Sequence, residues 1–90
     1  DICRLYDQAP NALIIASNET ARRCAPRRSI ALGPRKEPGQ ICAALFSALR
    51  EADDMGVSLI VLEALDTGGE GMAYMNRALR AAGFKYVIQA

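Results

Sequence analysis

The chain is predicted to fold as a three-layer α/β/α domain with a four-stranded, mainly parallel sheet. Short apolar runs alternate with segments of helical periodicity, in the order α-β-α-β-α-β-α-β. This alternation favours a parallel sheet that is covered by helices on both faces. Right-handed crossovers with one reversal of direction then give 2-1-3-4 as the preferred strand order. Residues 1–90 are long enough for a single domain with its own core.

The first half of the chain is predicted to hold two helices and two strands. Ile2, Leu5 and Tyr6 share one face of the first helix. Ser17 and Asn18 are good N-caps for the second helix, because their side chains accept hydrogen bonds from the free N–H groups of a first turn. The ranges are a helix over 1–8, a strand over 12–16, a helix over 19–25 and a strand over 29–32.

The second half begins with the longest predicted helix, which Pro38 opens and Gly56 ends. The buried stripe of this helix is expected to consist of Ile41, Leu45, Ala48, Leu49 and Ala52. A β-branched and leucine-rich run then predicts a buried parallel strand that ends at Glu63. The remaining ranges are that strand over 57–63, a glycine loop over 66–71, a helix through residue 80 and a last strand over 84–89.

Positive charge is concentrated in the first half, where residues 1–40 carry a net charge of +3 and residues 41–90 carry −2. A basic cluster with no acid inside it consists of Arg22, Arg23, Arg27, Arg28, Arg35 and Lys36. Such a cluster attracts phosphate or nucleic acid. No aromatic side chain is interleaved with it for base stacking, however. We therefore favour a solvated helix face and loop, and expect no direct nucleic-acid binding.

The residue types present exclude several kinds of site. The chain has no histidine, so Ser-His-Asp and Cys-His catalysis are excluded. Cys3, Cys24 and Cys42 form no CxxC pair, and we expect no metal site. Their odd number and wide spacing predict reduced thiols in a cytoplasmic protein.

No signal peptide and no membrane-spanning apolar run is recognised, so no membrane partner is expected. The first residue is Asp1 rather than methionine, and the pattern of a helix is already established there. We therefore expect the chain to be a piece of a longer polypeptide.

The strand order predicts a topological switch point between the first and third strands, which is where open α/β sheets bind ligands. Ser17, Asn18 and Glu19 frame it on one side, and the segment 63–71 frames it on the other. The glycines of that segment, Gly69 and Gly71, allow a tight turn at the start of a helix. The segment lacks a full GxGxxG or a P-loop, so a structural turn is favoured over an anion site.

Glu63 ends a strand that is expected to be buried, so its carboxylate must either meet a partner or face water. Arg77 and Arg80 on the following helix are available as that partner. A structural ion pair is favoured over a catalytic base. Asn76 and Arg77 lie about two turns beyond the loop, where a helix-surface hydrogen bond is the default interpretation.

Three segments together resemble the C-terminal, Sua-type domain of the two-domain threonylcarbamoyl-AMP synthases of the YrdC/Sua family. They are LFSALREADDMG over 45–56, IVLE over 60–63 and GEGMAYMNR over 69–77. That domain typically reads LFxALRxxDxxG, then an apolar strand ending in Glu, then GLGxAxxNR. The resemblance covers about 41–83 closely and the rest of the chain only in its order of elements. Glu70 stands where the family usually has leucine.

The resemblance implies a Rossmann-like accessory domain that a linker joins to an N-terminal YrdC-type catalytic domain, which is absent from this chain. The complete enzyme condenses threonine, bicarbonate and ATP to threonylcarbamoyl-AMP for the modification of tRNA adenosine. ATP and Mg²⁺ are implied for that parent enzyme, and no cofactor is implied for this domain. No catalytic residue is carried over. The ligand or interdomain-face candidates are Ser17, Asn18, Glu63, Gly69, Gly71, Asn76 and Arg77.

Two functions of different class are therefore open. The first is a noncatalytic accessory or regulatory domain of the synthase, with the catalytic domain and the tRNA-modification machinery as partners. The second is a free-standing α/β module that binds a nucleotide or phosphate at the switch point.

Overall fold

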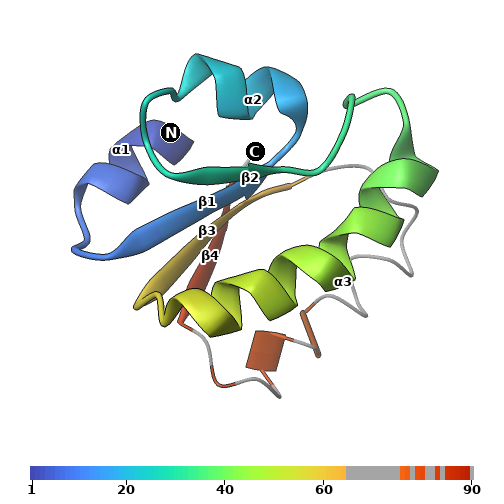
Figure 1. Cartoon of the computed structure of the whole chain (residues 1–90). Coiled ribbons are helices and arrows are strands. Elements are labelled where there is room, and N and C mark those ends of the chain that lie inside the picture. The colour runs from blue at the N-terminus through green and yellow to red at the C-terminus, as the bar shows by residue number, and fades with distance from the viewer. Residues whose placement is uncertain (65–75, 78, 81–82, 84, 90) are drawn as a thin grey trace.

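A computed structural model describes residues 1–64, 76–77, 79–80, 83 and 85–89. These residues form a four-stranded sheet in the order β2-β1-β3-β4, with every pair of neighbours parallel (Figure 1). The predicted strand order and direction are therefore confirmed. The elements are α1 (Ile2–Asp7), β1 (Ala12–Ala16), α2 (Asn18–Arg23), β2 (Ser29–Ala31), α3 (Pro38–Met55), β3 (Leu59–Glu63) and β4 (Tyr86–Gln89).

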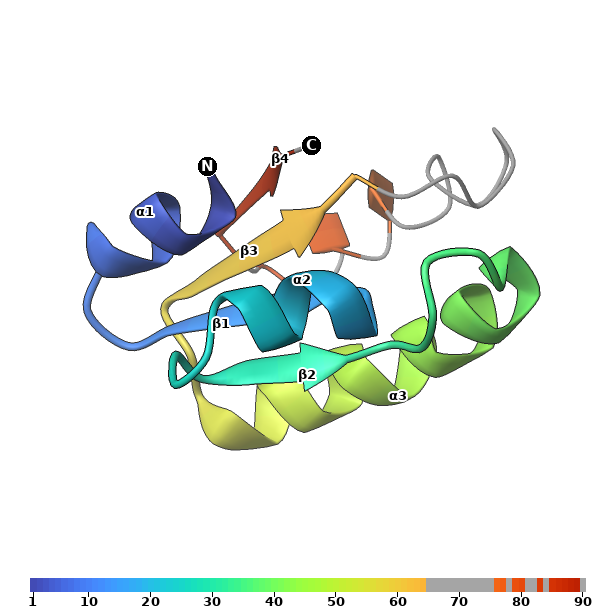
Figure 2. The same cartoon turned by 90° about the horizontal axis from the view of Figure 1, so that it is seen from above.

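Helices cover both faces of this sheet. Figures 1 and 2 show α1 and α2 on one side of it and α3 on the other. Successive residues of a strand point to opposite faces, so the fully buried β1 contributes to both layers. Leu13 and Ile15 pack in the cluster that includes the apolar face of α3. Ile14 and Ala16 pack in the cluster that includes Ile2 of α1. The predicted α/β/α layering is confirmed.

α3 has the single apolar face that its sequence predicts. Pro38 occupies its first turn, and Gly56 ends it with φ +62° and ψ +38°, a left-handed conformation that favours glycine. The buried residues of α3 are Ile41, Leu45, Ala48 and Ala52, and Leu49 is partly buried beside them. None of the described helices is both long enough and apolar enough to cross a lipid bilayer.

The other elements differ from the predicted ranges only near their ends. α2 begins one residue earlier than predicted, at Asn18, because Ser17 is the N-cap. It ends at Arg23 rather than near Ala25. β3 begins at Leu59, two residues later than predicted, and Val57 is buried just before it.

β4 lies beside β3 at an edge of the sheet, and its side chains alternate between the two faces. Tyr86 and Ile88 pack in the cluster on the α3 side, and Val87 packs in the cluster on the α1 side. Residues 76–77 and 79–80 are helical, and Leu79 is buried in the α3-side cluster. The predicted glycine loop over 66–71, with Gly69 and Gly71, lies outside the described residues.

The cysteine prediction is wrong in part, because Cys3 and Cys24 form a disulfide. Their Cα atoms are 5.5 Å apart, which is a usual separation for bonded cysteines. α1 and the end of α2 pack on the same face of the sheet, so folding brings together two residues that are 21 positions apart. Sequence spacing carries no information about that approach. Cys42 on α3 is a free thiol, as predicted.

Candidate functional site

The carboxyl ends of β1 and β3 meet at the predicted switch point. The two strands are neighbours in the sheet, although α2, β2 and α3 separate them in the chain. Ser17 follows β1 directly and has no exposed surface, and Glu63 is the last residue of β3 and is 6% exposed. The structure therefore brings together two predicted site residues that are 46 positions apart.

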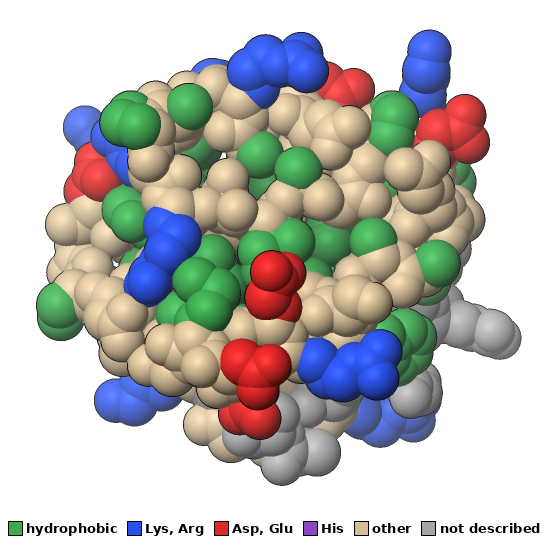
Figure 3. All heavy atoms as spheres, in the orientation of Figure 1, with side chains coloured by type: hydrophobic (Ala, Val, Ile, Leu, Met, Phe, Trp, Pro, Cys, Tyr) green, Lys and Arg blue, Asp and Glu red, His purple; other side chains and the backbone are tan. Residues whose placement is uncertain are grey.

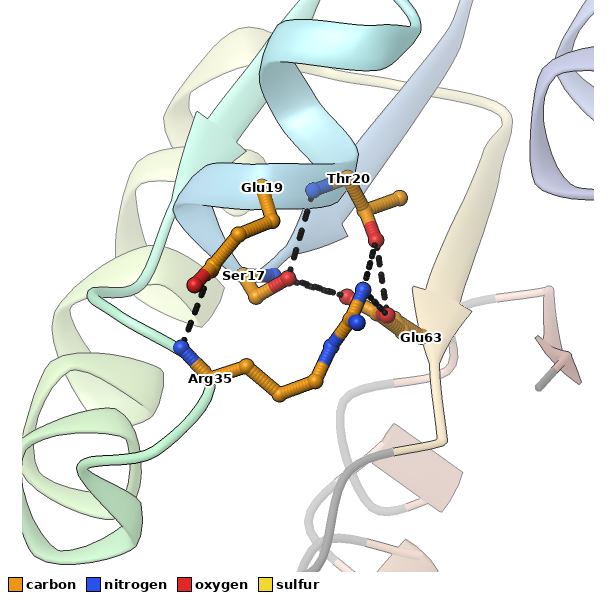
Figure 4. A network of polar contacts seen from close by, with 5 residues as sticks. All are labelled: Ser17, Glu19, Thr20, Arg35 and Glu63. Atoms are coloured by element: carbon orange, nitrogen blue, oxygen red, sulfur yellow. Dashed lines mark hydrogen bonds and ion pairs between the residues drawn. The ribbon is translucent and has the colours of Figure 1, made fainter.

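Each of the two carboxylate oxygens of Glu63 accepts two hydrogen bonds (Figure 4). Ser17 donates to Oε1 from its backbone N–H at 2.9 Å and from its hydroxyl at 2.8 Å. Thr20 donates to Oε2 from Oγ1 at 2.7 Å, and Arg35 donates to the same oxygen from Nη2 at 3.0 Å. The ion-pair partner of Glu63 is therefore Arg35. The expected ion-pair partners, Arg77 and Arg80, do not pair with Glu63.

The two hydroxyl groups of the site each donate and accept. The Ser17 hydroxyl donates to Glu63 and accepts from the backbone N–H of Thr20 at 3.3 Å, which caps α2. The Thr20 hydroxyl donates to Glu63 and accepts from Nη2 of Arg35 at 2.9 Å. Buried polar networks are stable when each member is satisfied in this way. We call these four residues, Ser17, Thr20, Arg35 and Glu63, the Glu63 network.

Arg35 connects this network to the loop between β2 and α3. Its backbone N–H donates to Oε1 of Glu19 at 2.9 Å, while its side chain, 53% exposed, reaches Glu63. The backbone N–H of Asn18 donates to the carbonyl of Gly33 at 2.9 Å, at the start of the same loop. Gly33 has φ +133°, and a Cβ there would lie 3.0 Å from the Gln40 side chain. The loop is therefore held against the start of α2 by backbone and side-chain bonds.

The pKa of the Glu63 carboxyl reflects two opposing causes. Burial raises its pKa, because a charged carboxylate is costly away from water. Hydrogen bonds from Thr20 and Ser17, with the positive charge of Arg35, lower it and outweigh the burial. The net effect is a pKa below the ordinary value, so Glu63 is a charged acceptor at neutral pH. A hydrogen bond from the Arg35 backbone likewise lowers the pKa of Glu19.

Asn76 and Arg77, two further predicted residues, are not members of this network. Asn76 is partly buried, and its Oδ1 accepts a hydrogen bond from the Tyr86 hydroxyl at 3.3 Å, which ties it to β4. Arg77 is exposed. Asn18 enters the region through its backbone bond to Gly33.

The prediction missed Thr20 and Arg35 as members of the site. Thr20 is three residues after the Ser17 N-cap, so its side chain belongs to the same first turn, and that spacing was a usable signal. Arg35 was assigned to the basic cluster, and its 28-residue separation from Glu63 left no local signal.

Three residues of the basic cluster have structural partners. Arg27 forms a bidentate ion pair with Asp7, in which Nε donates to Oδ1 at 2.8 Å and Nη2 donates to Oδ2 at 2.7 Å. This pair lowers the pKa of the Asp7 carboxyl. Arg28 donates to the Ala12 carbonyl, and Arg35 belongs to the Glu63 network. On the face drawn in Figure 3, basic and acidic side chains are scattered among each other. That face has no continuous basic surface.

The acidic and sulfur-containing side chains of the described residues are not clustered as metal ligands. No group of three or more Cys, Asp or Glu side chains within them is placed to hold an ion. Glu63, the buried carboxylate of this part of the chain, has both oxygens engaged by protein donors. A general base needs an oxygen directed at a substrate proton, so the geometry of Glu63 is that of a structural clamp.

Comparisons with known proteins add the family. The sequence model of the family described as threonylcarbamoyl-AMP synthase, C-terminal domain, matches residues 2–83 of this chain. The chain belongs to this family. The matched residues include the whole Glu63 network and the segment 41–83, for which the sequence analysis described the resemblance.

Two curated relatives have the same family name. The chain is similar to the threonylcarbamoyl-AMP synthase of Pyrococcus abyssi, with 40% identity over 48 residues, which are 53% of the chain and 14% of that protein. It is similar to the threonylcarbamoyl-AMP synthase of Bacillus subtilis, with 36% identity over 55 residues, which are 61% of the chain and 16% of that protein. The matched regions thus span about one seventh of the relatives' length.

Proposed function

We propose that this chain is a noncatalytic accessory domain of a threonylcarbamoyl-AMP synthase. In this proposal, it acts beside an N-terminal YrdC-type catalytic domain in the threonylcarbamoyl modification of tRNA, in the cytoplasm. The catalytic domain supplies the ATP and Mg²⁺ site. The match of residues 2–83 to the C-terminal domain family is the observation that carries the proposal.

The Glu63 network supports the noncatalytic part of this proposal. The hydroxyls of Ser17 and Thr20 donate to the Glu63 carboxylate at the switch point. Such an arrangement stabilises the carboxyl edge of the sheet, and it leaves the chemistry to another domain. The edge is then a rigid platform for contacts with that domain.

The test adds this chain in trans to the catalytic domain of its parent enzyme and measures threonine-dependent release of pyrophosphate from ATP. We expect saturable binding by calorimetry and a change in rate of at least severalfold. A heat-denatured sample of the chain is the control. If the chain neither binds the catalytic domain nor changes its rate, the accessory role is contradicted.

A matched pair of variants tests the predicted interdomain face. Arg77 is a candidate for that face, and Arg80 is an exposed arginine three residues further along the same segment. Arg77→Ala should weaken binding to the catalytic domain, and Arg80→Ala should bind like the parent chain. Equal affinities for all three proteins would remove Arg77 from the interface.

A second candidate is a free-standing module that binds a nucleotide or phosphate. The switch point between β1 and β3 favours it, because ligands of open α/β sheets bind there, and Arg35 offers a partly exposed cation. The charged Glu63 disfavours it, because it would repel an anion. Amide NMR during titration with AMP, ATP and threonine tests this function. Shifts confined to residues 17–20 and 67–72 would support it, and an unchanged spectrum would contradict it.

A further inference from the structure

α1 packs on β1 and β3, and its polar and covalent ties go to one segment, residues 24–28. Cys3 in its first turn is bonded to Cys24. Asp7 at its end is paired with Arg27, and the backbone N–H of Arg28 donates to the Tyr6 hydroxyl at 3.2 Å. The disulfide is the one covalent bond among these three interactions, and the Asp7–Arg27 and Tyr6–Arg28 hydrogen bonds lie at exposed positions.

α1 has too few residues to persist as a helix without such ties. It spans six residues, whereas isolated helices shorter than about 12–15 residues are marginal in water. Its fully buried apolar anchor is Ile2, which is 1% exposed and packs in the cluster with Ile14 and Val61, and Leu5 and Tyr6 pack against that cluster while partly exposed. Exposed ion pairs contribute little to stability. The placement of α1 therefore depends on the disulfide together with the packing of Ile2, Leu5 and Tyr6 on the sheet.

We propose that the Cys3–Cys24 disulfide is a redox-sensitive clamp that holds α1 on the sheet, and that a dithiol reductant releases α1 by opening it. The free Cys42 is on α3, on the opposite side of the sheet, and takes no part. Release of α1 uncovers the face of β1 and β3 that Ile14 and Val61 occupy. This proposal is independent of the function proposed above.

The two cysteine residues differ in exposure, which sets the order of the exchange. Cys3 is partly exposed, and Cys24 has no exposed surface. A thiolate of the reductant attacks Sγ of Cys3, and the Sγ–Sγ bond breaks with Cys24 leaving as a thiolate that takes up a proton. The second thiol of the reductant then attacks the mixed disulfide, and Cys3 leaves and is protonated. The protein gains two electrons and two protons, and the reductant becomes a cyclic disulfide.

The size of the effect follows from the loop that the bond closes. Cys3 and Cys24 are 21 positions apart, and closing a loop of that length restricts the detached chain considerably. Opening the bond should raise the population of detached α1 on the order of 100-fold. Amide hydrogens of residues 3–8 should then exchange faster by a similar factor.

The experiment treats the chain with either oxidised or reduced dithiothreitol. The number of free thiols is then measured by mass after alkylation of the unfolded protein, and the mobility of α1 is measured by hydrogen exchange of the native protein. We expect one alkylated cysteine, Cys42, in the oxidised sample and all cysteines alkylated in the reduced one. Exchange over residues 3–8 should rise about 100-fold on reduction, with the buried stripe of α3 unchanged. Full alkylation after oxidation would overturn the proposal. Equal exchange of α1 in both states would also overturn it.

Two variants separate the clamp from a general effect of reductant. Cys42→Ser should keep the full redox response. Cys3→Ser should exchange rapidly over α1 in both oxidised and reduced buffer, and it removes the more exposed cysteine, so that folding is less disturbed than by a change at Cys24. A redox response that persists in Cys3→Ser would overturn the proposal.

Discussion

At the scale of single residues, Glu63 shows how burial and charge are reconciled. A buried carboxylate is costly unless donors surround it. Here two hydroxyls, one backbone N–H and one guanidinium supply four hydrogen bonds to its two oxygens. The same donors keep the pKa of Glu63 below its ordinary value. Two predictions concern this side chain.

Glu63→Gln should lower the free energy of unfolding by about 1–3 kcal/mol. The side chain keeps its size, but one oxygen becomes an NH₂ donor that faces other donors. Urea unfolding measures the change as a shift in midpoint at constant slope. Glu51→Gln on the exposed face of α3 is the control and should stay within about 0.5 kcal/mol. A midpoint for Glu63→Gln equal to that of the control would contradict a structural role of the Glu63 network.

The pH dependence of stability should report the same carboxyl. The pKa of Glu63 is lower in the folded chain than in the unfolded chain, so the folded state binds fewer protons. Its contribution is therefore complete above the ordinary pKa of 4.5 and is lost as the pH falls through the folded pKa. Asp7 and Glu19 shift in the same direction. The difference between the parent chain and Glu63→Gln, measured by urea unfolding, should thus shrink below pH 4.5. A constant difference down to pH 2 would contradict this assignment.

At the scale of elements, the loop between β2 and α3 is positioned by Arg35. The residue bonds to α2 through its backbone and to the end of β3 through its side chain. One residue therefore connects three parts of the carboxyl edge of the sheet. Its exposed fraction limits the energy of the ion pair, because water screens it.

Arg35→Ala should loosen this loop more than it destabilises the chain. We expect faster amide exchange over residues 33–37 and a loss of about 1 kcal/mol in unfolding free energy. The pKa of Glu63 should also rise, because a positive neighbour is removed. Lys36→Ala changes the adjacent exposed cation and is the matched control. If both variants exchange alike over 33–37, Arg35 does not hold the loop.

At the scale of the whole molecule, β1 makes the two halves of the core interdependent. Leu13 and Ile14 are adjacent in the chain, have no exposed surface and belong to the two different apolar clusters. Neither layer keeps its packing if β1 is lost. The two faces are therefore expected to unfold as one cooperative unit in the oxidised protein.

Leu13→Ala and Ile14→Ala test this interdependence from opposite faces. Each should lower the free energy of unfolding of the entire chain by about 2–5 kcal/mol, because each leaves a cavity in a packed cluster. Urea unfolding, followed by far-ultraviolet circular dichroism and by the tyrosine signal, should give coincident transitions for both variants. Two separate transitions in either variant would contradict a shared core.

The residue patterns were sufficient for the architecture. Alternation of apolar runs with helical periodicity predicted the parallel sheet, and the Ser17 cap with the Pro38 and Gly56 boundaries predicted helix ends. These signals are local, since each depends on residues within one element or at its ends. The strand order came from the general rule that crossovers are right-handed. The prediction that Ser17 and Glu63 frame one place also succeeded, because the carboxyl ends of neighbouring parallel strands lie at one edge.

By itself, then, the sequence determined the elements, their order and the strand ends at which a polar site would form. Only the tertiary structure decided which side chains meet there: Arg35 rather than a later arginine pairs with Glu63, Thr20 joins it, and Cys3 bonds to Cys24. These partners lie 28, 43 and 21 positions apart. The Arg35–Glu63 and Cys3–Cys24 contacts depend on how whole elements pack across the sheet, and no local pattern of residues encodes that packing. Thr20 differs, because its spacing from the Ser17 cap places it in the first turn of α2.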